Sequence, residues 1–280
     1  MKHLITLVAI CATLAAGLDS ANAQAVGDIQ VTVTNEGNSD FSLTPLWFGF
    51  HNNTSFDTFD VGGTASSGLQ EIAELGSVGT FNNEFIAAAG TPGNIQGVAT
   101  TPGGFPNAPV VEPGETGTGF VTPINPANYQ YFNFASMLIG SNDLFIGNDN
   151  PAEYQVFTST GAINDASGVF EIGVYQDSLY DAGTEINDPS ATGGAAFIAG
   201  ATGTDGADEN GTIQLATQAD LSTYNGANTP INTLNDTTFG DGVRIATIRV
   251  SFVPAAIPEP SSLVVLGLGL GGMFLRRRRS

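Results

Sequence analysis

Apolar and polar residues alternate along several short stretches of this chain. In the first, Ile29, Val31 and Val33 fall on one face and the polar residues between them fall on the other. An alternation with period two is typical of a strand that buries one face. Similar stretches recur at residues 45–52, 129–139, 169–175, 211–218 and 243–253, separated by turn-forming Gly, Pro, Asn and Asp. This pattern predicts an all-β fold, an antiparallel β-sandwich.

Only one stretch has a clear helical pattern. In residues 64–76 a Thr or Ser can cap the start, Gly76 can end the helix, and an apolar stripe lies between them, formed by Leu69, Ile72, Ala73 and Leu75. Residues 90–123 are rich in Gly, Pro and Thr, and we expect an extended loop or a pair of loops there. The prediction is therefore a sandwich with one short helix.

The first 23 residues have the features of an export signal. They contain Lys2, an apolar run over residues 4–18 and a small-x-small site that ends at Ala23. We interpret residues 1–23 as a signal peptide cut after Ala23. The only cysteine, Cys11, lies inside this segment, so no disulfide is expected in the exported part.

The last 24 residues have the features of a second targeting signal. In residues 257–280, Pro258-Glu259-Pro260 is followed by an uncharged segment over 261–275 and then by four arginines, 276–279. The uncharged segment is shorter than the roughly 20 residues of a spanning helix, and the arginines favour the cytoplasmic side. The order and spacing resemble the PEP-CTERM sorting signal of Gram-negative bacteria. That resemblance implies transient inner-membrane anchoring and cleavage by an exosortase-type protease, in bacteria that make extracellular polysaccharide. A permanent C-terminal anchor is the alternative.

Acidic residues far outnumber basic ones, 27 to 7. Leaving out Asp19 and Glu259, the other 25 carboxylates lie between Gln24 and Pro258 with only Arg244 and Arg249, so this region carries a net charge of about −23. Such a surface repels nucleic acid and anionic lipid and attracts cations. We therefore expect no nucleic-acid partner. Some carboxylates must face water, and a cluster of them suits a hard divalent metal.

The stretch SLYDAGTEIND, residues 178–188, sharpens the metal hypothesis. It places Asp181 and Glu185 four residues apart around Gly183, which favours a loop over a helix. Calcium takes carboxylate, carbonyl and water oxygens in flexible geometry, so a sharply folded loop of this kind can converge on it. In the alternative reading, Asp181 caps a turn and Glu185 is solvated.

Two central stretches resemble the spondin domain, a module of extracellular matrix proteins. They are ASMLIGSNDLFIG at 135–147 and YDAGTE at 180–185, and matching pieces extend the resemblance over residues 28–253. The resemblance implies one domain over 24–256, a sandwich related to the calcium-dependent phospholipid-binding domains, with bound calcium. Its implied calcium ligands are Asp143, Asp181 and Glu185, the last in place of an aspartate.

Two further acidic stretches, 204–212 and 147–154, are interpreted as surface turns. The first lacks the complete pattern of a calcium loop and is at best a weak second ion site, and the second contains ordinary turn formers.

A catalytic site has little support in the sequence. Beyond the predicted signal peptide there are one histidine, His51, and no cysteine, so nucleophilic triads and zinc sites are not readily assembled. We expect His51 to be structural. No feature selects a pair of carboxylates of the kind glycosidases use.

The sequence thus predicts a non-enzymatic, calcium-binding protein at the cell surface or in the exopolysaccharide matrix, an adhesion or matrix component with a polysaccharide or surface protein as partner. Two alternatives stay open: a secreted polysaccharide-acting enzyme that uses two carboxylates, and calcium-dependent membrane docking, which the negative charge disfavours. Trp47 and Tyr180 are candidates for sugar contact if exposed, although such aromatics more often pack in the core.

Overall fold

The computed structural model describes residues 28–52, 55–89, 95–102, 109–122, 125–190, 196–199, 206–240 and 242–253. The predicted signal peptide, the predicted sorting signal and Asp205 lie outside these residues. Across the described residues, no helix is both long and apolar enough to cross a membrane.

One antiparallel sheet has four strands in the order β5 (Thr116–Val121), β1 (Ile29–Asn35), β11 (Ala246–Phe252) and β8 (Val169–Val174). Along β1 the burial alternates as the sequence predicts, with Ile29, Val31 and Val33 buried. Val31 lies opposite Gly119 on one side and opposite Val250 on the other. The sheet therefore turns one apolar face inward and one polar face outward.

A larger antiparallel sheet faces it. Its order is β10 (Gln214–Leu215), β9 (Leu179–Asp181), β7 (Leu144–Gly147), β6 (Tyr131–Ile139), β3 (Leu46–His51) and β4 (Gln96–Ala99), and the short β2 (Ser42–Leu43) also pairs with β6. The prediction of an antiparallel β-sandwich is confirmed.

The main core fills the space between the sheets. Phe48, Phe50, Phe132 and Phe134 extend from β3 and β6 into it and meet the inward residues of β1 and β11. All six residues of β3 are buried, because the opposite face of the larger sheet is also covered. This explains why the central strands are apolar on both faces and do not alternate strictly.

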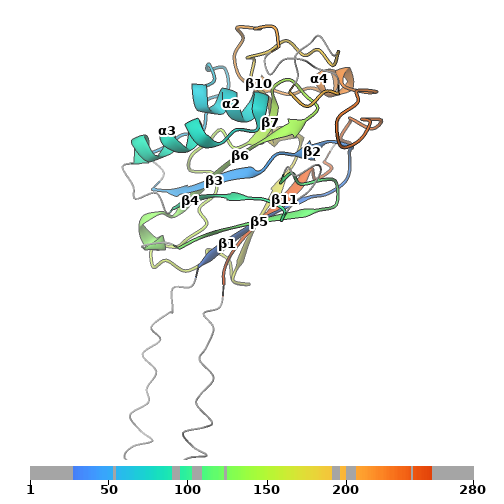
Figure 1. Ribbon diagram of the computed structural model, residues 1–280. Helices are drawn as coiled ribbons and strands as arrows, with labels where there is room; N and C mark the ends of the chain where they lie inside the picture. The colour runs from blue at the N-terminus through green and yellow to red at the C-terminus, as the bar shows by residue number, and fades with distance from the viewer. Residues whose placement is uncertain are drawn as a thin grey trace, which may run out of the picture. The chain divides into compact units, whose positions relative to one another are not determined.

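Two helices cover that opposite face (Figure 1): α2 (Ser67–Leu75) and α3 (Gly79–Ala89). Ser66 caps α2, its side chain accepting a hydrogen bond from the Leu69 N–H at 3.1 Å, and Gly76 ends it in a left-handed conformation with φ 65°. Leu69 and Ile72 pack with Phe81 and Phe85 of α3 into a second apolar cluster against the sheet. The helix predicted within 64–76 is therefore present.

The described residues hold more helix than the sequence predicts. Besides α2 and α3 they include α4 (Gln218–Thr223) and two short 3-10 helices, Pro126–Asn128 and Gln176–Ser178. The prediction of a single helix is wrong because α3 buries only Phe81 and Phe85, which is too few apolar positions for a recognisable stripe. The strand predicted over 211–218 is also only the two residues of β10.

The loop predicted over residues 90–123 contains two strands, β4 and β5. On β5 the inward positions include Gly117 and Gly119. A side chain at Gly119 would bring its Cβ within 2.4 Å of the carbonyl oxygen of Val98, so the two strands approach too closely for any larger residue. The glycines of β5 allow the close approach of the two strands. A composition that is typical of loops therefore belongs to a strand here.

Trp47 and Tyr180 lie in the second apolar cluster, with 0% and 5% of their surface exposed. The alternative in which they contact sugar is therefore wrong. His51 is buried at the end of β3, where burial lowers its pKa and Asn133 forms a hydrogen bond with its side chain. This environment agrees with a structural role.

Candidate metal centre

Asp143 lies in the tight turn between β6 and β7 and has no exposed surface. One carboxylate oxygen, Oδ2, accepts three hydrogen bonds: from the Thr184 N–H at 2.8 Å, the Thr184 hydroxyl at 3.1 Å and the Glu185 N–H at 3.1 Å. The other oxygen, Oδ1, is equally buried and has no hydrogen-bond donor. The turn thus carries a buried carboxylate that is half satisfied.

The loop that follows β9 reaches Asp143 directly. Leu144 pairs with Asp181 across the β7–β9 ladder, and the Ala182 N–H donates to the Asp143 carbonyl oxygen at 3.2 Å. Gly183 then turns the chain with φ 66°. A Cβ at this position would lie 2.7 Å from the backbone N and O of Thr212, so only glycine fits both the conformation and the space.

The Asp181 carboxylate faces its own loop. Its Oδ1 accepts from the Gly183 N–H at 2.8 Å and its Oδ2 accepts from the Asn187 side chain at 2.7 Å. The negative charge of Asp181 also acts on the Asp143 carboxyl group. The two aspartates are therefore close enough for their charges to interact.

Glu185 is buried as well, with 2% of its surface exposed. Its Oε2 accepts a hydrogen bond from the Asn142 side chain at 3.2 Å, and its Oε1 accepts one from the Gly206 N–H. The solvated alternative for Glu185 is thus contradicted by its burial.

A polar cluster that the sequence reasoning missed supports this loop. The Tyr224 hydroxyl accepts from the Asn142 N–H at 3.0 Å and lies 2.5 Å from the side-chain oxygen of Asn187. Asn142 Oδ1 in turn accepts from the Asp188 N–H at 2.9 Å. Asn142 and Asn187 adjoin the predicted ligands in sequence, but Tyr224 is 82 residues away from Asn142 and no local pattern marks it.

Burial dominates the electrostatics of this site. It raises the pKa of Asp143 to about 7, with a smaller contribution from the charge of Asp181. Burial also raises the pKa of Asp181, against the opposing hydrogen bonds from Gly183 and Asn187. Both arginines of residues 24–258 lie elsewhere: Arg249 is on β11, and Arg244 and Arg249 both bind Glu171 on β8. Among the residues that the structure describes, no arginine or lysine offsets the two aspartates.

The three predicted ligands lie in one region but do not form a complete metal-coordination site. Within the described ranges, no group of three or more His, Cys, Asp or Glu side chains is arranged to hold a metal ion. Asp181 and Glu185 direct their oxygens at Asn187, Asn142 and backbone N–H groups, and Asp143 Oδ1 alone lacks a partner. The assignment of calcium to Asp143, Asp181 and Glu185 stays a prediction.

Of the other acidic stretches, 147–154 forms a turn, but the turn predicted over 204–212 is wrong for its described part, because Asp208 forms an antiparallel bridge with Glu185. Asp208 and Glu209 are exposed. In the second stretch, the Asn150 side chain accepts from the Ala152 N–H at 2.9 Å, as in an ordinary Asn turn.

Comparison with known proteins adds one firm assignment. A family model described as the PEP-CTERM protein-sorting motif matches residues 256–279. A spondin domain was not identified, and none of the curated proteins matches the chain. The chain therefore carries a PEP-CTERM sorting motif, which implies processing by an exosortase and export to the cell surface of a Gram-negative bacterium.

Proposed function

We propose that the exported domain binds calcium through Asp143, Asp181 and Glu185 and serves, without catalysing a reaction, as an adhesion or matrix component of the cell surface or exopolysaccharide. The observation that carries the proposal is the Asp143 carboxylate, buried completely with one oxygen unpartnered. An unpartnered buried charge is unfavourable, and coordination to a cation removes that cost.

The donor set favours calcium among common metals. Every candidate ligand is an oxygen, which excludes the thiolate and imidazole chemistry that zinc prefers. Calcium accepts carboxylates and carbonyls in flexible arrangements, whereas magnesium demands near-ideal octahedral geometry. Ligation by Asp181 or Glu185 exchanges their hydrogen bonds to Asn187 or Asn142 for bonds to the ion. The resemblance of residues 135–147 and 180–185 to spondin domains supports the same three ligands.

The burial of Asp143 also supports a non-enzymatic role. A carboxyl group with a pKa near 7 beside a second acid is a familiar arrangement in glycosidases. Asp143 has no exposed surface, however, and its Oδ2 already accepts three hydrogen bonds, so a polysaccharide chain has no access to it. We therefore assign the raised pKa of Asp143 to a buried metal ligand and not to a general acid.

Calorimetric titration with calcium chloride tests the binding claim. We expect one calcium per chain with a dissociation constant in the range of about 10⁻⁴ to 10⁻³ M, as in extracellular calcium modules. Asp143→Asn removes the charged ligand with little change in shape and should abolish the heat. Glu171→Gln, a carboxylate change on the other sheet, should leave it unchanged. Equal binding by all three proteins would exclude this site.

A cell assay tests the surface role. Chelation with EGTA should release the protein from the cell surface or matrix fraction, and Asp143→Asn should be released without chelator. The purified protein should leave the chain length of the host's polysaccharide unchanged. Depolymerisation by the native protein would favour the enzyme alternative.

A further inference from the structure

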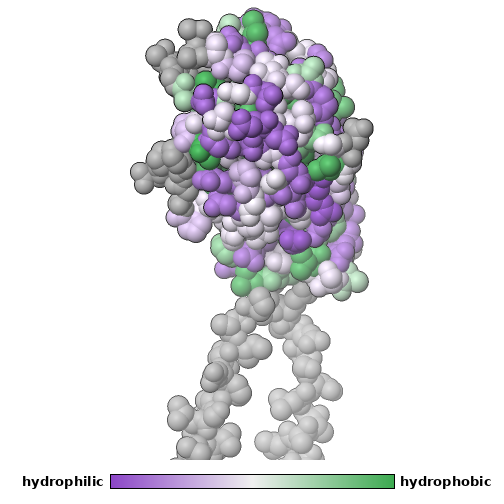
Figure 2. Space-filling view, turned by 90° about the vertical axis from the view of Figure 1, so that its right-hand side faces the viewer, coloured by the Kyte–Doolittle hydropathy of each residue, from purple (hydrophilic) through white to green (hydrophobic). Residues whose placement is uncertain are grey.

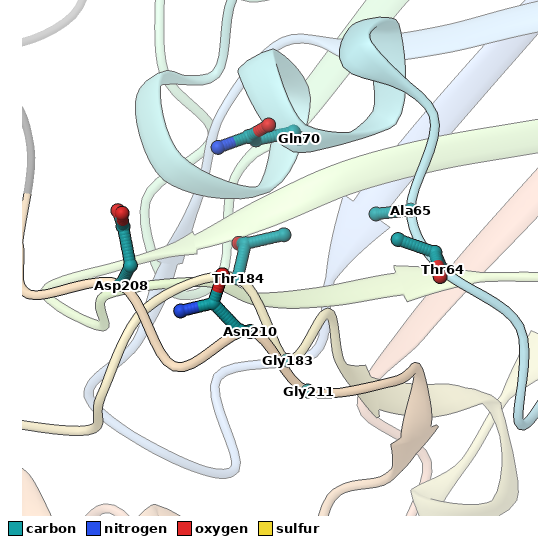
Figure 3. Close-up of a pocket in the computed structure, with 8 residues that line it drawn as sticks. All are labelled: Thr64, Ala65, Gln70, Gly183, Thr184, Asp208, Asn210 and Gly211. Carbon is teal, nitrogen blue, oxygen red and sulfur yellow. The ribbon is translucent and has the colours of Figure 1, made fainter.

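A polar hollow of about 330 Å³ lies beside the loop of residues 181–188, the proposed calcium loop (Figure 3). Gln70 of α2 lines it on one side, while Thr184, Asp208 and Asn210 come from the two loops on the opposite side. Its remaining lining residues are Thr64, Ala65, Gly183 and Gly211. Its size lies at the lower end of the range for small-molecule sites, but such sites are mostly apolar and this one is not.

Backbone hydrogen bonds fix the walls of the hollow. Residues 183–186 and 207–211 run antiparallel, joined by bonds from the Ile186 N–H to the Ala207 oxygen at 2.9 Å and from the Gly211 N–H to the Gly183 oxygen at 2.7 Å. Beyond them, Ile213 exchanges backbone bonds with Gly62 and Gly63, next to Thr64. Three segments distant in sequence are therefore held together around one space.

Several side chains around this space retain unused hydrogen-bonding groups. Within the described part of the chain, the exposed side chains of Thr64, Asp208 and Asn210 make no hydrogen bond. Asn210 has a left-handed backbone with φ 56°, a conformation that Asn adopts more readily than most residues. The Thr184 hydroxyl donates to Asp143 and keeps its acceptor lone pairs. The hollow is thus lined by both hydrogen-bond donors and hydrogen-bond acceptors.

The lining selects a class of ligand by its chemistry. Its only charged residue is Asp208, in a region that carries a net charge of about −23, so anions are repelled. Ala65 is the only apolar side chain in it, so an apolar ligand gains little by entering. Amide, hydroxyl and carboxylate groups together match a compound rich in hydroxyl groups, each of which both donates and accepts. We propose that this hollow binds one uncharged sugar unit of a polysaccharide.

The hollow and the calcium loop share Thr184. Its N–H and hydroxyl hold Asp143, its carbonyl accepts from the Glu209 N–H at 3.0 Å, and its side chain faces the hollow. An ion at Asp143 would restrain Thr184 and with it one wall, which should strengthen sugar binding. The inference deepens the proposed function, and only its calcium dependence rests on that function.

Amide chemical-shift mapping of the exported protein tests the inference. The neutral probes are glucose, galactose and N-acetylglucosamine, and the charged probes are glucuronate and glucosamine. We expect at least one neutral probe to shift the signals of residues 64–70, 183–184 and 208–211 at millimolar concentration, and glucuronate to leave them unchanged. Shifts by no neutral probe, or by glucosamine alone, would overturn the proposal.

Substitutions in the lining test whether the sugar binds in this hollow. Asp208→Ala combined with Asn210→Gly should weaken the best neutral probe at least tenfold, since glycine keeps the left-handed turn while removing the amide. Thr64→Val, which keeps the side-chain shape, should weaken it less. Asp177→Ala is the matched control, because Asp177 is also exposed and its side chain makes no hydrogen bond among the described residues. Equal weakening by the control would place the sugar elsewhere and overturn the proposal.

Repeating the mapping with calcium and with EGTA separates the two claims. If sugar binding persists in EGTA and calcium produces no heat, the hollow is a sugar site and the calcium site is contradicted. Calcium binding without any sugar binding upholds the site and contradicts the hollow.

Discussion

Two carboxylates on opposite sides of the sandwich show how differently one chemical group is compensated. Glu171 on β8 is exposed and binds two arginines, with its Oε1 2.8 Å from Arg244 and its Oε2 2.9 Å from Arg249. The hydrogen bond from Arg244 is the largest contribution to its lowered pKa. Asp143 is buried, its carboxylate accepts hydrogen bonds from Thr184 and Glu185, and its pKa is raised to about 7.

The difference follows from the distribution of positive charge. The two arginines of residues 24–258 both bind Glu171, so the charge of the aspartates near β7 and β9 is left to be compensated by hydrogen bonds, by protonation or by an external cation. Hydrophilic residues also predominate on the face shown in Figure 2, with hydrophobic residues in small separate patches. An acidic domain can thus keep a hydrophilic surface while one carboxylate is buried without an arginine or lysine beside it among the described residues.

The largest expected effect is the pH dependence of the calcium-free protein. The pKa of Asp143 is about 7 when folded against an ordinary value of 3.8, so folding takes up a proton between these pH values. The free energy of unfolding should therefore fall as pH rises through this window, by as much as about 4 kcal/mol, and level off above it. Urea unfolding in EGTA from pH 4 to 8 measures this. Asp143→Asn should lose the slope between about pH 6 and 7, above the range in which Asp57, with its pKa raised to about 6, also takes up a proton. A slope unchanged there in that variant would place its origin elsewhere.

Removal of the buried acceptor should have the next largest effect. Asp143→Ala leaves the N–H groups of Thr184 and Glu185 without a partner and should lower the free energy of unfolding by about 3 kcal/mol at pH 5. The exposed counterpart, Glu171→Ala, should cost less than about 1 kcal/mol, as exposed ion pairs do. Chemical denaturation compares them, and equal losses would contradict the contrast between the two regions.

Gly183→Ala should cost about 2 to 3 kcal/mol. It combines a left-handed backbone with a Cβ 2.7 Å from the Thr212 backbone. Gly168→Ala is a matched control near β8, because Gly168 has a similar φ of 77° but an open surrounding. The difference between their melting temperatures reports the close approach alone. Equal melting temperatures would show that the turn at Gly183 tolerates a side chain.

Tyr224→Phe should have the smallest effect, about 1 to 2 kcal/mol. It removes the hydroxyl group to which the Asn142 N–H donates and so loosens Asn142, whose side chain also donates to Glu185. Tyr175→Phe on the arginine side removes a hydroxyl that binds Arg244 and should cost less. Calcium titration of both variants checks whether Tyr224 supports the ion site. Unaltered calcium affinity in Tyr224→Phe would separate this cluster from the site.

Local patterns predicted the sandwich well because apolar and polar residues alternate in the sequence of strands such as β1 and β11, as buried and exposed positions do in a strand. They failed at β5, where Gly117 and Gly119 carry no apolar signal, and at α3, where two phenylalanines are its only buried residues. In the structure Asp143 contacts the loop that carries Asp181 and Glu185, the other two residues named in the sequence analysis, while their role as calcium ligands stays a prediction. The family resemblance gave no sign of Tyr224 or of the hollow, which three distant segments form only after folding.

The most direct test of the account is a carbon-13 NMR titration of the Asp143 carboxyl group, assigned by its absence in Asp143→Asn, with and without calcium. Without calcium the account predicts a midpoint near pH 7. With saturating calcium the midpoint should fall below the ordinary value of 3.8, because the ion stabilises the charged form. Identical midpoints under both conditions would contradict the claim that this buried carboxylate binds a cation.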